Sequence, residues 1–294
     1  MGMSVELQDH LGKGVTTMCH AWLIERADGV RYGFTDHDLP LAFDGVAFKA
    51  DSGLSALALQ QSTGLSIDNT EAMGALSDAA IREADIEAGR FDGAEVTAWL
   101  VNWQDVSQRL LQFRGSIGEM TRRGGAFRAE LRGLTEALNR PMGRVFQKPC
   151  TAVLGDASCQ FDLDTPGYFT VRVVEGVENR SIFRFAGMNE FEPGWFERGQ
   201  FSGHSGAAEG LNGMIKRDYF DGNQRVIELW QPVRAEIVAG DQIRLDAGCD
   251  KRMKTCQLKF NNLVNFQGFP DLPGEDWMMV QPSQASSQTG GSRR

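Results

Sequence analysis

The sequence has no long apolar run and no excess of basic residues. No stretch approaches the roughly 20 apolar residues that a membrane span needs. The polar N-terminus, MGMSVELQDHLGKG, lacks the apolar core of a secretory signal. A net charge of -9 argues against nucleic-acid binding over the whole surface, although a local basic patch stays open. We therefore expect synthesis and folding in a reducing cytoplasm, where stable disulfides are disfavoured.

Recognisable catalytic motifs are missing as well. No glycine-rich loop follows an expected strand and opens a helix, which argues against a phosphate-binding loop. His204 has only Ser and Gly beside it, and no Ser-His-Asp or Gly-x-Ser-x-Gly context is present. The stretch 34–38, FTDHD, could bind a divalent ion, but we interpret it as a turn in which Asp36 and Asp38 cap backbone N–H groups. The residues therefore do not predict an enzyme.

What the sequence does contain is an ordinary hydrophobic content divided by many turn signals. The 294 residues are 41% hydrophobic and 23% charged, which suffices for one large or two medium domains with buried cores. Short strand-like segments alternate with turn signals about every 8–12 residues, as in β-barrels and sandwiches. We expect a mainly β protein, barrel- or sandwich-like, with a few short helices.

In the first half, the Asp-Gly pairs at 28–29 and 44–45 predict two hairpins. Ser77-Asp78 is typical of an N-cap, and it predicts a short helix that ends at Gly89. A second short helix is expected over 134–139. The expected strands that follow the first hairpins are 93–103, 109–120 and 126–134.

In the second half, period-two alternation and turn signals predict more strands. They are expected at 168–177, 181–187, 195–203, 213–220, 224–230 and 241–248. Asp221-Gly222-Asn223 predicts a hairpin turn. We predict three parts: an N-terminal β-rich domain over 1–145, a C-terminal β-rich domain with a cysteine cluster over 146–280, and a flexible Ser/Gly-rich tail over 281–294.

Four of the five cysteines lie in two turn-rich segments. Cys150 and Cys159 lie in KPCTAVLGDASCQFD, and Cys249 and Cys256 lie in residues 248–274, GCDKRMKTCQLKFNNLVNFQGFPDLPG. The second segment has too many turn residues for an ordinary helix or strand, so we expect that a bond to another group holds it in place. A metal bound by all four thiolates would join the segments. The spacings C-x8-C and C-x6-C match no common motif, so separate free cysteines or disulfides stay open.

The fifth cysteine, Cys19, lies among apolar residues and is expected to be a buried free thiol. Cations surround the other four in the sequence, and they would stabilise the negative charge of a thiolate-bound iron–sulfur cluster. Each could equally be a solvated surface group. These cations are Lys148, Lys251, Arg252, Lys254 and Lys259.

Three runs of the sequence carry a family resemblance. They are residues 240–274, GDQIRLDAGCDKRMKTCQLKFNNLVNFQGFPDLPG; residues 195–218, WFERGQFSGHSGAAEGLNGMIKRD; and residues 32–50, YGFTDHDLPLAFDGVAFKA. They resemble baseplate hub proteins of long-tailed phages and gene transfer agents. The likeness runs from about residue 10 to 275, and its cysteine-bearing end is the most specific part.

The resemblance implies a structural virion component rather than an enzyme. Related tail-tip proteins carry an iron–sulfur cluster, which implies a [4Fe-4S] cluster on Cys150, Cys159, Cys249 and Cys256. On chemistry alone zinc fits four thiolates equally. The family further implies a homotrimer at the tail tip of a virion or gene transfer agent particle, assembled in the bacterial cytoplasm. Its expected neighbours are a distal tail protein, a central tail-tip or fibre (megatron-like) protein and the tape measure protein.

The hub domains would continue the tail channel, through which DNA passes without specific binding during DNA delivery. An acidic protein suits such a channel, because like charges repel. The alternative function is a tail-tip zinc-binding hydrolase acting on the cell wall. A closed four-cysteine site disfavours it, since catalytic zinc keeps an open coordination position. An electron carrier is disfavoured because the cluster would be a small part of a large β protein.

Overall fold

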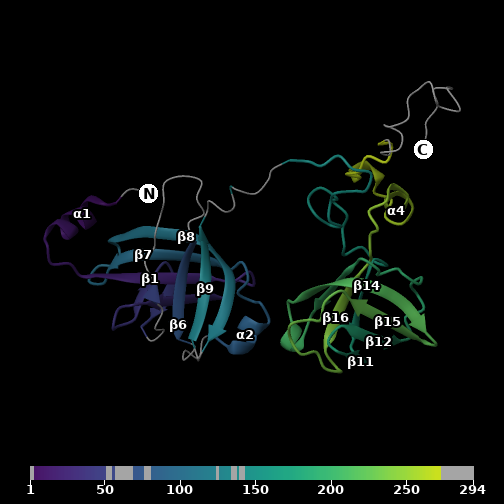
Figure 1. Cartoon of the computed structure of the whole chain (residues 1–294), viewed down its shortest axis with the longest axis horizontal. Coiled ribbons are helices and arrows are strands. Elements are labelled where there is room, and N and C mark those ends of the chain that lie inside the picture. Colours follow the sequence, from purple (N-terminus) through teal and green to yellow (C-terminus); the bar gives the residue numbers. More distant parts are fainter. Residues whose placement is uncertain are drawn as a thin grey trace, which may run out of the picture. The chain divides into compact units, whose positions relative to one another are not determined.

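The structure is a computed structural model that describes residues 3–50, 55–56, 69–75, 81–123, 126–133, 138 and 143–272. The chain divides into two compact units, Met1–Pro141 and Met142–Arg294, each built on one β-sheet (Figure 1). The prediction of a mainly β protein with a few short helices is confirmed. Within these ranges, no helix has the length and apolar character to cross a membrane.

The N-terminal unit contains a sheet whose described strands follow the order β3-β4-β2-β1-β7-β8-β9-β6-β5. Both Asp-Gly hairpins form, and Gly29 and Gly45 have φ angles of 83° and 73°, which glycine adopts without a Cβ penalty. The strands are β1 (Met18–Glu25), β2 (Arg31–Thr35), β3 (Leu41–Phe43), β4 (Val46–Lys49), β5 (Ser55–Ala56), β6 (Asn69–Ala75), β7 (Glu95–Asn102), β8 (Arg109–Arg123) and β9 (Ala126–Gly133).

Strand β1 is buried on both faces, because alternate side chains of a strand point in opposite directions. Trp22 and Ile24 belong to the main core of the unit, whereas Cys19 belongs to a smaller core with Phe48. Cys19 is a buried free thiol, as predicted, and its Sγ lies 3.5 Å from the carbonyl oxygen of Val101. Burial raises the pKa of this thiol.

Helix α1 (Val5–Gly12) was not expected from the polar N-terminal sequence. The hydroxyl of Ser4 caps it by accepting a hydrogen bond from the Leu7 N–H at 3.3 Å. The side chain of Leu7 is fully buried, and the N–H of Thr17 donates to His10 Nε2 at 3.1 Å. One apolar side chain and one histidine contact therefore anchor this helix.

Helix α2 (Glu83–Glu87) begins later than predicted, after an extended Arg82. The preceding residue, Ile81, is buried in the main core, which holds the chain extended at this point. The predicted cap, Ser77-Asp78, lies outside the described residues. Gly89 follows the helix with φ 72°, as predicted. The helix expected over 134–139 lies almost wholly outside the described residues.

The C-terminal unit has a sheet in the order β10-β16-β13-β14-β15-β12-β11. Its two edge strands, β10 and β11, are consecutive in the chain and only two residues apart, so the sheet curls until its edges approach each other (Figure 1). The strands are β10 (Phe169–Val173), β11 (Gly176–Glu178), β12 (Ile182–Ala186), β13 (Gln200–Gly203), β14 (Asn212–Asp221), β15 (Gln224–Leu229) and β16 (Gln242–Asp246).

Two strand predictions in this unit were wrong in extent. The strand expected over 168–177 breaks at the buried Val174, whose N–H donates to Asp241 O at 2.8 Å as the chain changes edges. Within 195–203, only Gln200–Gly203 is a strand. The hairpin turn at 221–223 is confirmed by the pairing of β14 with β15.

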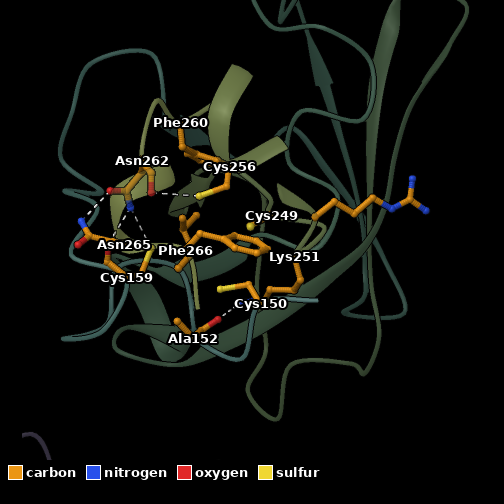
Figure 2. A pocket seen from close by; sticks show the side chains of 12 residues that line it. Cys150, Ala152, Cys159, Cys249, Lys251, Cys256, Phe260, Asn262, Asn265 and Phe266 are labelled. Carbon is orange, nitrogen blue, oxygen red and sulfur yellow. Dashed lines mark hydrogen bonds between the residues drawn. The ribbon is translucent and has the colours of Figure 1, made fainter. Parts of the chain in front are cut away.

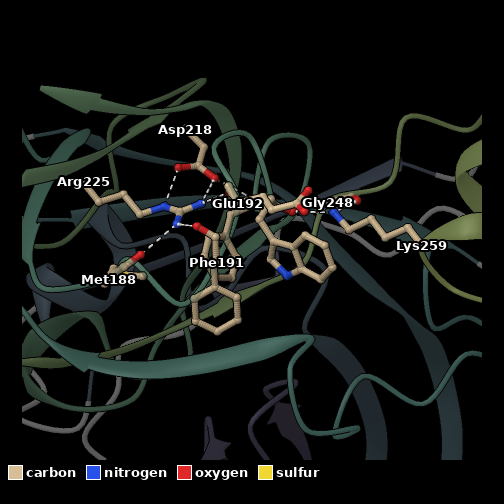
Figure 3. Close-up of polar contacts among 9 residues, drawn as sticks. Met188, Phe191, Glu192, Asp218, Arg225, Gly248 and Lys259 are labelled. Atoms are coloured by element: carbon tan, nitrogen blue, oxygen red, sulfur yellow. Dashed lines mark hydrogen bonds and ion pairs between the residues drawn. The ribbon is translucent and has the colours of Figure 1, made fainter.

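A buried ion pair lies in the C-terminal core (Figure 3). Arg225 Nε and Nη2 donate to the two carboxylate oxygens of Asp218 at 2.7 and 2.6 Å, and both side chains are 0% exposed. The remaining donors bind the carbonyl oxygens of Met188, Phe191 and Glu192 at 3.1, 2.8 and 2.7 Å. All five guanidinium N–H groups are thus used, which offsets the cost of removing the charges from water.

Replacing Arg225 with Met should lower the free energy of unfolding of the C-terminal unit by about 3–5 kcal/mol, because Asp218 would stay buried without its partner. Amide hydrogen exchange of β14 and β15 measures this loss. The matched control is Arg217→Met, since the Arg217 side chain is 66% exposed; it should cost less than about 1 kcal/mol. Equal losses in the two variants would contradict the importance of the buried pair.

Candidate four-cysteine site

The four cysteines singled out in the sequence line a single cavity (Figure 2). Cys150 and Cys159 come from the loop before β10, whereas Cys249 and Cys256 come from the segment after β16. All four are free thiols. The cavity volume open to water is about 20 Å³, whereas one water molecule needs roughly 10–15 Å³ by the same measure. The fold therefore brings both cysteine pairs to one small cavity.

The thiols share the cavity without forming a ready ion site. In the part of the chain that the structure describes, no group of three or more His, Cys, Asp or Glu side chains is arranged to hold a metal ion. The proximity of the thiols is seen instead in a raised pKa. Burial is the main cause that raises the pKa of Cys256 to about 11, and the neighbouring Cys249, Cys150 and Cys159 add to the rise.

The second cysteine segment is more regular than predicted. Helix α4 (Met253–Leu258) carries Cys256, whose N–H donates to Arg252 O at 3.0 Å, and a 3-10 turn, η2 (Leu263–Asn265), follows. The run MKTCQL has no Gly or Pro and consists mostly of residues that tolerate a helix. Residues with turn conformations flank it instead, at Lys251 with φ 66° and at Asn261 with φ 47°. The expectation of no ordinary helix was therefore wrong.

Hydrogen bonds join the two cysteine segments directly. The Cys150 N–H donates to Lys251 O at 2.8 Å, and Asn262 Nδ2 donates to Cys159 O at 2.7 Å. The ammonium of Lys251 also donates to the carbonyl oxygen of Ala152. The first segment therefore supplies partners for the backbone of the second, so hydrogen bonds hold the second segment in part, and the expected metal tie stays a prediction.

An aromatic cluster packs beside the cavity. Phe260, which lines the cavity and is 4% exposed, has ring centroids 5.0 Å from Phe161 and 5.6 Å from Tyr168. The Tyr168 hydroxyl donates to Lys259 O at 2.6 Å. These contacts anchor the second cysteine segment on the sheet and give the cavity an apolar wall.

The five predicted cations divide into three groups. Lys251 and Arg252 line the cavity, but the Arg252 side chain is 80% exposed, and Lys148 and Lys254 are exposed as well. Lys259 instead donates through Nζ to the carbonyl oxygens that belong to Trp195 and Gly248, at 2.6 and 2.9 Å (Figure 3). Burial lowers the pKa of Lys259 to about 8. One cation, Lys251, thus lies against the cavity loop, and a second, Lys259, ties the cysteine segment to Trp195 on the β core.

Two N–H groups point at cysteine sulfurs. The Gln267 N–H lies 3.4 Å from Cys150 Sγ, and Asn262 Nδ2 lies 3.5 Å from Cys159 Sγ. Hydrogen bonds of this kind stabilise thiolate ligands and tune the group they bind. Four thiols, two such donors, one nearby cation and an apolar wall supply the chemistry that a thiolate-bound metal or cluster needs, although the thiols are not arranged around an ion position. Zinc and iron–sulfur groups share these requirements.

The other candidates from the sequence have structural partners. The Asp36 carboxylate accepts from His20 N at 2.6 Å and pairs with His20 Nδ1 at 2.8 Å, so it caps the neighbouring strand rather than its own turn. His37 Nδ1 accepts from the Leu39 N–H at 3.0 Å. His204 is exposed, and its N–H donates within the sheet. Residues 36–38 form a bend that follows β2, as the turn interpretation predicted, but the predicted local capping by Asp36 was wrong, because its partner is His20 of the neighbouring strand.

In metal-free protein, the high pKa of Cys256 should slow its reaction with iodoacetamide, because the thiolate is the reactive form. Relative to a thiol with the ordinary pKa of 9.0, a pKa of about 11 leaves about 100-fold less thiolate at pH 8. Mass spectrometry should show the rate rising about tenfold per pH unit up to pH 10. The same thiol in urea-unfolded protein is the control; a plateau near pH 9 in folded protein would contradict the assignment.

Comparison with known proteins points to one family. Residues 4–162 match the family model described as baseplate hub protein, N-terminal attachment domain, and residues 194–276 match that of a phage conserved hypothetical protein, BR0599. A chain in the solved structure of the virion of a native gene transfer agent (GTA) particle is 52% identical, with a TM-score of 0.91, over 98% of this chain and 99% of that chain. No curated protein matches. Since the first model spans more than half of the sequence, the chain belongs to the baseplate hub protein family.

Proposed function

We propose that this chain is a structural baseplate hub at the tip of a phage-like tail, in a gene transfer agent or a siphophage, and that its cysteine cavity holds a structural [4Fe-4S] cluster. Similarity over almost the full length to a chain of a gene transfer agent virion supports the first part. The second part is carried by one observation: four thiols from two distant segments line the same cavity.

The proposal extends to assembly. Three copies form a ring that continues the DNA channel of the tail, between the distal tail protein and the central tail-tip protein, with the tape measure protein as a further neighbour. Two β-sheet units per chain supply rigid walls for such a ring. The net charge of -9 suits passage of DNA without adhesion, since like charges repel.

The cluster would be held by Cys150, Cys159, Cys249 and Cys256. When bound, it supplies metal–thiolate bonds that join the loop before β10 to the segment after β16. The chain itself adds a positive charge beside the cavity, on Lys251, and the apolar wall limits water. The role is structural, because thiolate bonds favour the folded arrangement of the two segments.

Protein purified without oxygen should be brown, with a broad absorption band near roughly 400 nm and about four irons and four sulfides per chain. Cys249→Ser should lose most of this iron, whereas Cys19→Ser, which changes a buried thiol of the other unit, should keep it. A colourless protein with one zinc would contradict the cluster and preserve the thiolate link. Protein without any metal would contradict both.

Cys256→Ser should raise the rate of protease cleavage within residues 249–272 several-fold and leave the N-terminal unit unchanged. The effect is partial, because hydrogen bonds also hold this segment. Cleavage sites and rates are read by mass spectrometry. As the control, a chelator should produce the same change in wild-type protein and no further change in Cys256→Ser. Unchanged protection of 249–272 in the variant would refute the structural role of the thiolate link.

A further inference from the structure

Asn262 contacts a cysteine of each segment (Figure 2). Its side-chain Nδ2 donates to Cys159 O at 2.7 Å and lies 3.5 Å from Cys159 Sγ. Its backbone N–H donates to Cys256 O at 3.0 Å, and its backbone oxygen accepts from Cys256 Sγ at 3.3 Å. One residue thus fixes the distance between the loop before β10 and helix α4 at the cavity itself.

The orientation of this amide is determined by its partners. A carbonyl oxygen can only accept, so the group that faces Cys159 O is the NH2 of Asn262. The other end, Oδ1, accepts from Asn265 Nδ2 at 2.8 Å. A reversed amide would place two oxygens together on one side and two NH2 groups together on the other. Asn262 therefore presents its donors to Cys159 in a fixed geometry.

We propose that Asn262 is a positioning residue of the four-cysteine site. It holds Cys159 at the cavity and donates an N–H···S hydrogen bond that stabilises a thiolate there. Asparagine suits both tasks, because a single NH2 supplies two donors without adding a charge. The metal-dependent part of this inference rests on the proposed cluster, whereas the positioning of Cys159 is a property of the protein alone.

Asn262 is the contact to test by mutagenesis, because the donor to Cys150 is the backbone N–H of Gln267, which side-chain substitution leaves in place. Asn262→Asp keeps the size and the acceptor oxygen but removes both donors and adds a negative charge, which itself lowers a reduction potential. Asn262→Ala removes the side-chain contacts altogether. Gln257→Ala is the matched control, since Gln257 is an exposed amide in α4 beside Cys256.

The first test uses reduced, metal-free full-length protein and measures the alkylation rate of each cysteine by mass spectrometry. Asn262→Ala should raise the rate at Cys159, which is 8% exposed, several-fold. Gln257→Ala should not, and Cys19 in the other unit should be unaffected in both. Amide exchange of β15 checks that the sheet domain stays folded. An unchanged Cys159 rate in a folded Asn262→Ala variant would overturn the positioning role.

The second test uses protein with its metal group. Loss of a supporting hydrogen bond typically lowers metal affinity by about 10- to 100-fold, so Asn262→Asp should release iron to a chelator more readily than wild type or Gln257→Ala. For a cluster, the midpoint potential should also fall, because N–H···S bonds stabilise the reduced, more negative state.

The outcomes separate the two claims. Wild-type protein without iron would overturn the proposed cluster, and the alkylation rates would then decide the positioning role by themselves. Wild-type protein with a cluster, combined with unchanged iron release and potential in Asn262→Asp, would overturn the proposed N–H···S stabilisation. More readily released iron and a lower potential in both Asn262→Asp and the uncharged Asn262→Ala, but not in Gln257→Ala, would support it.

Discussion

The structure of the C-terminal unit depends on two cations, one buried and one half-buried, that bind backbone carbonyl oxygens of irregular segments. Buried carbonyl groups outside a sheet need donors. Arg225 donates hydrogen bonds to three carbonyl groups in the segment before β13 and also pairs with Asp218. Lys259 donates hydrogen bonds to the carbonyl oxygens of Trp195 and Gly248. Without these donors, the turns between β12 and β13 would lose the partners that fix them on the sheet.

The second of these cations also positions the cysteines. Lys259 follows helix α4 directly, and its ammonium binds the carbonyl oxygen of Gly248, the residue before Cys249. The Gly248 N–H in turn donates to Trp195 O at 2.8 Å. Gly248, beside Cys249, and Lys259, beside the helix that carries Cys256, thus both donate to the carbonyl oxygen of Trp195. The positions of Cys249 and Cys256 therefore depend on how Trp195 packs against the β core.

The sequence predicted the parts of this protein that depend on local patterns. Asp-Gly pairs predicted the hairpins that Gly29 and Gly45 close, because their φ angles favour glycine. The sequence could not predict that Arg225 is buried. The segment around Arg225 alternates polar and apolar residues like an ordinary strand whose charged side chains point into solvent. Nor could spacing show that Asn262 lies against Cys159, 103 positions earlier. Turn residues after α4 also obscured a short helix, because a few Asn and Gly dominate such a window.

The hydrogen bonds between the cysteine segments decide what a bound metal group can contribute. In small zinc domains the site forms only with the metal, so binding supplies the folding free energy. Here the Cys150–Lys251 and Cys159–Asn262 contacts already hold the segments together, and an aromatic cluster anchors them. Much of the ordering entropy is therefore lost during folding of the chain itself. A thiolate-bound group would therefore add rigidity to a site that the chain has already assembled, rather than supply the free energy that folds it.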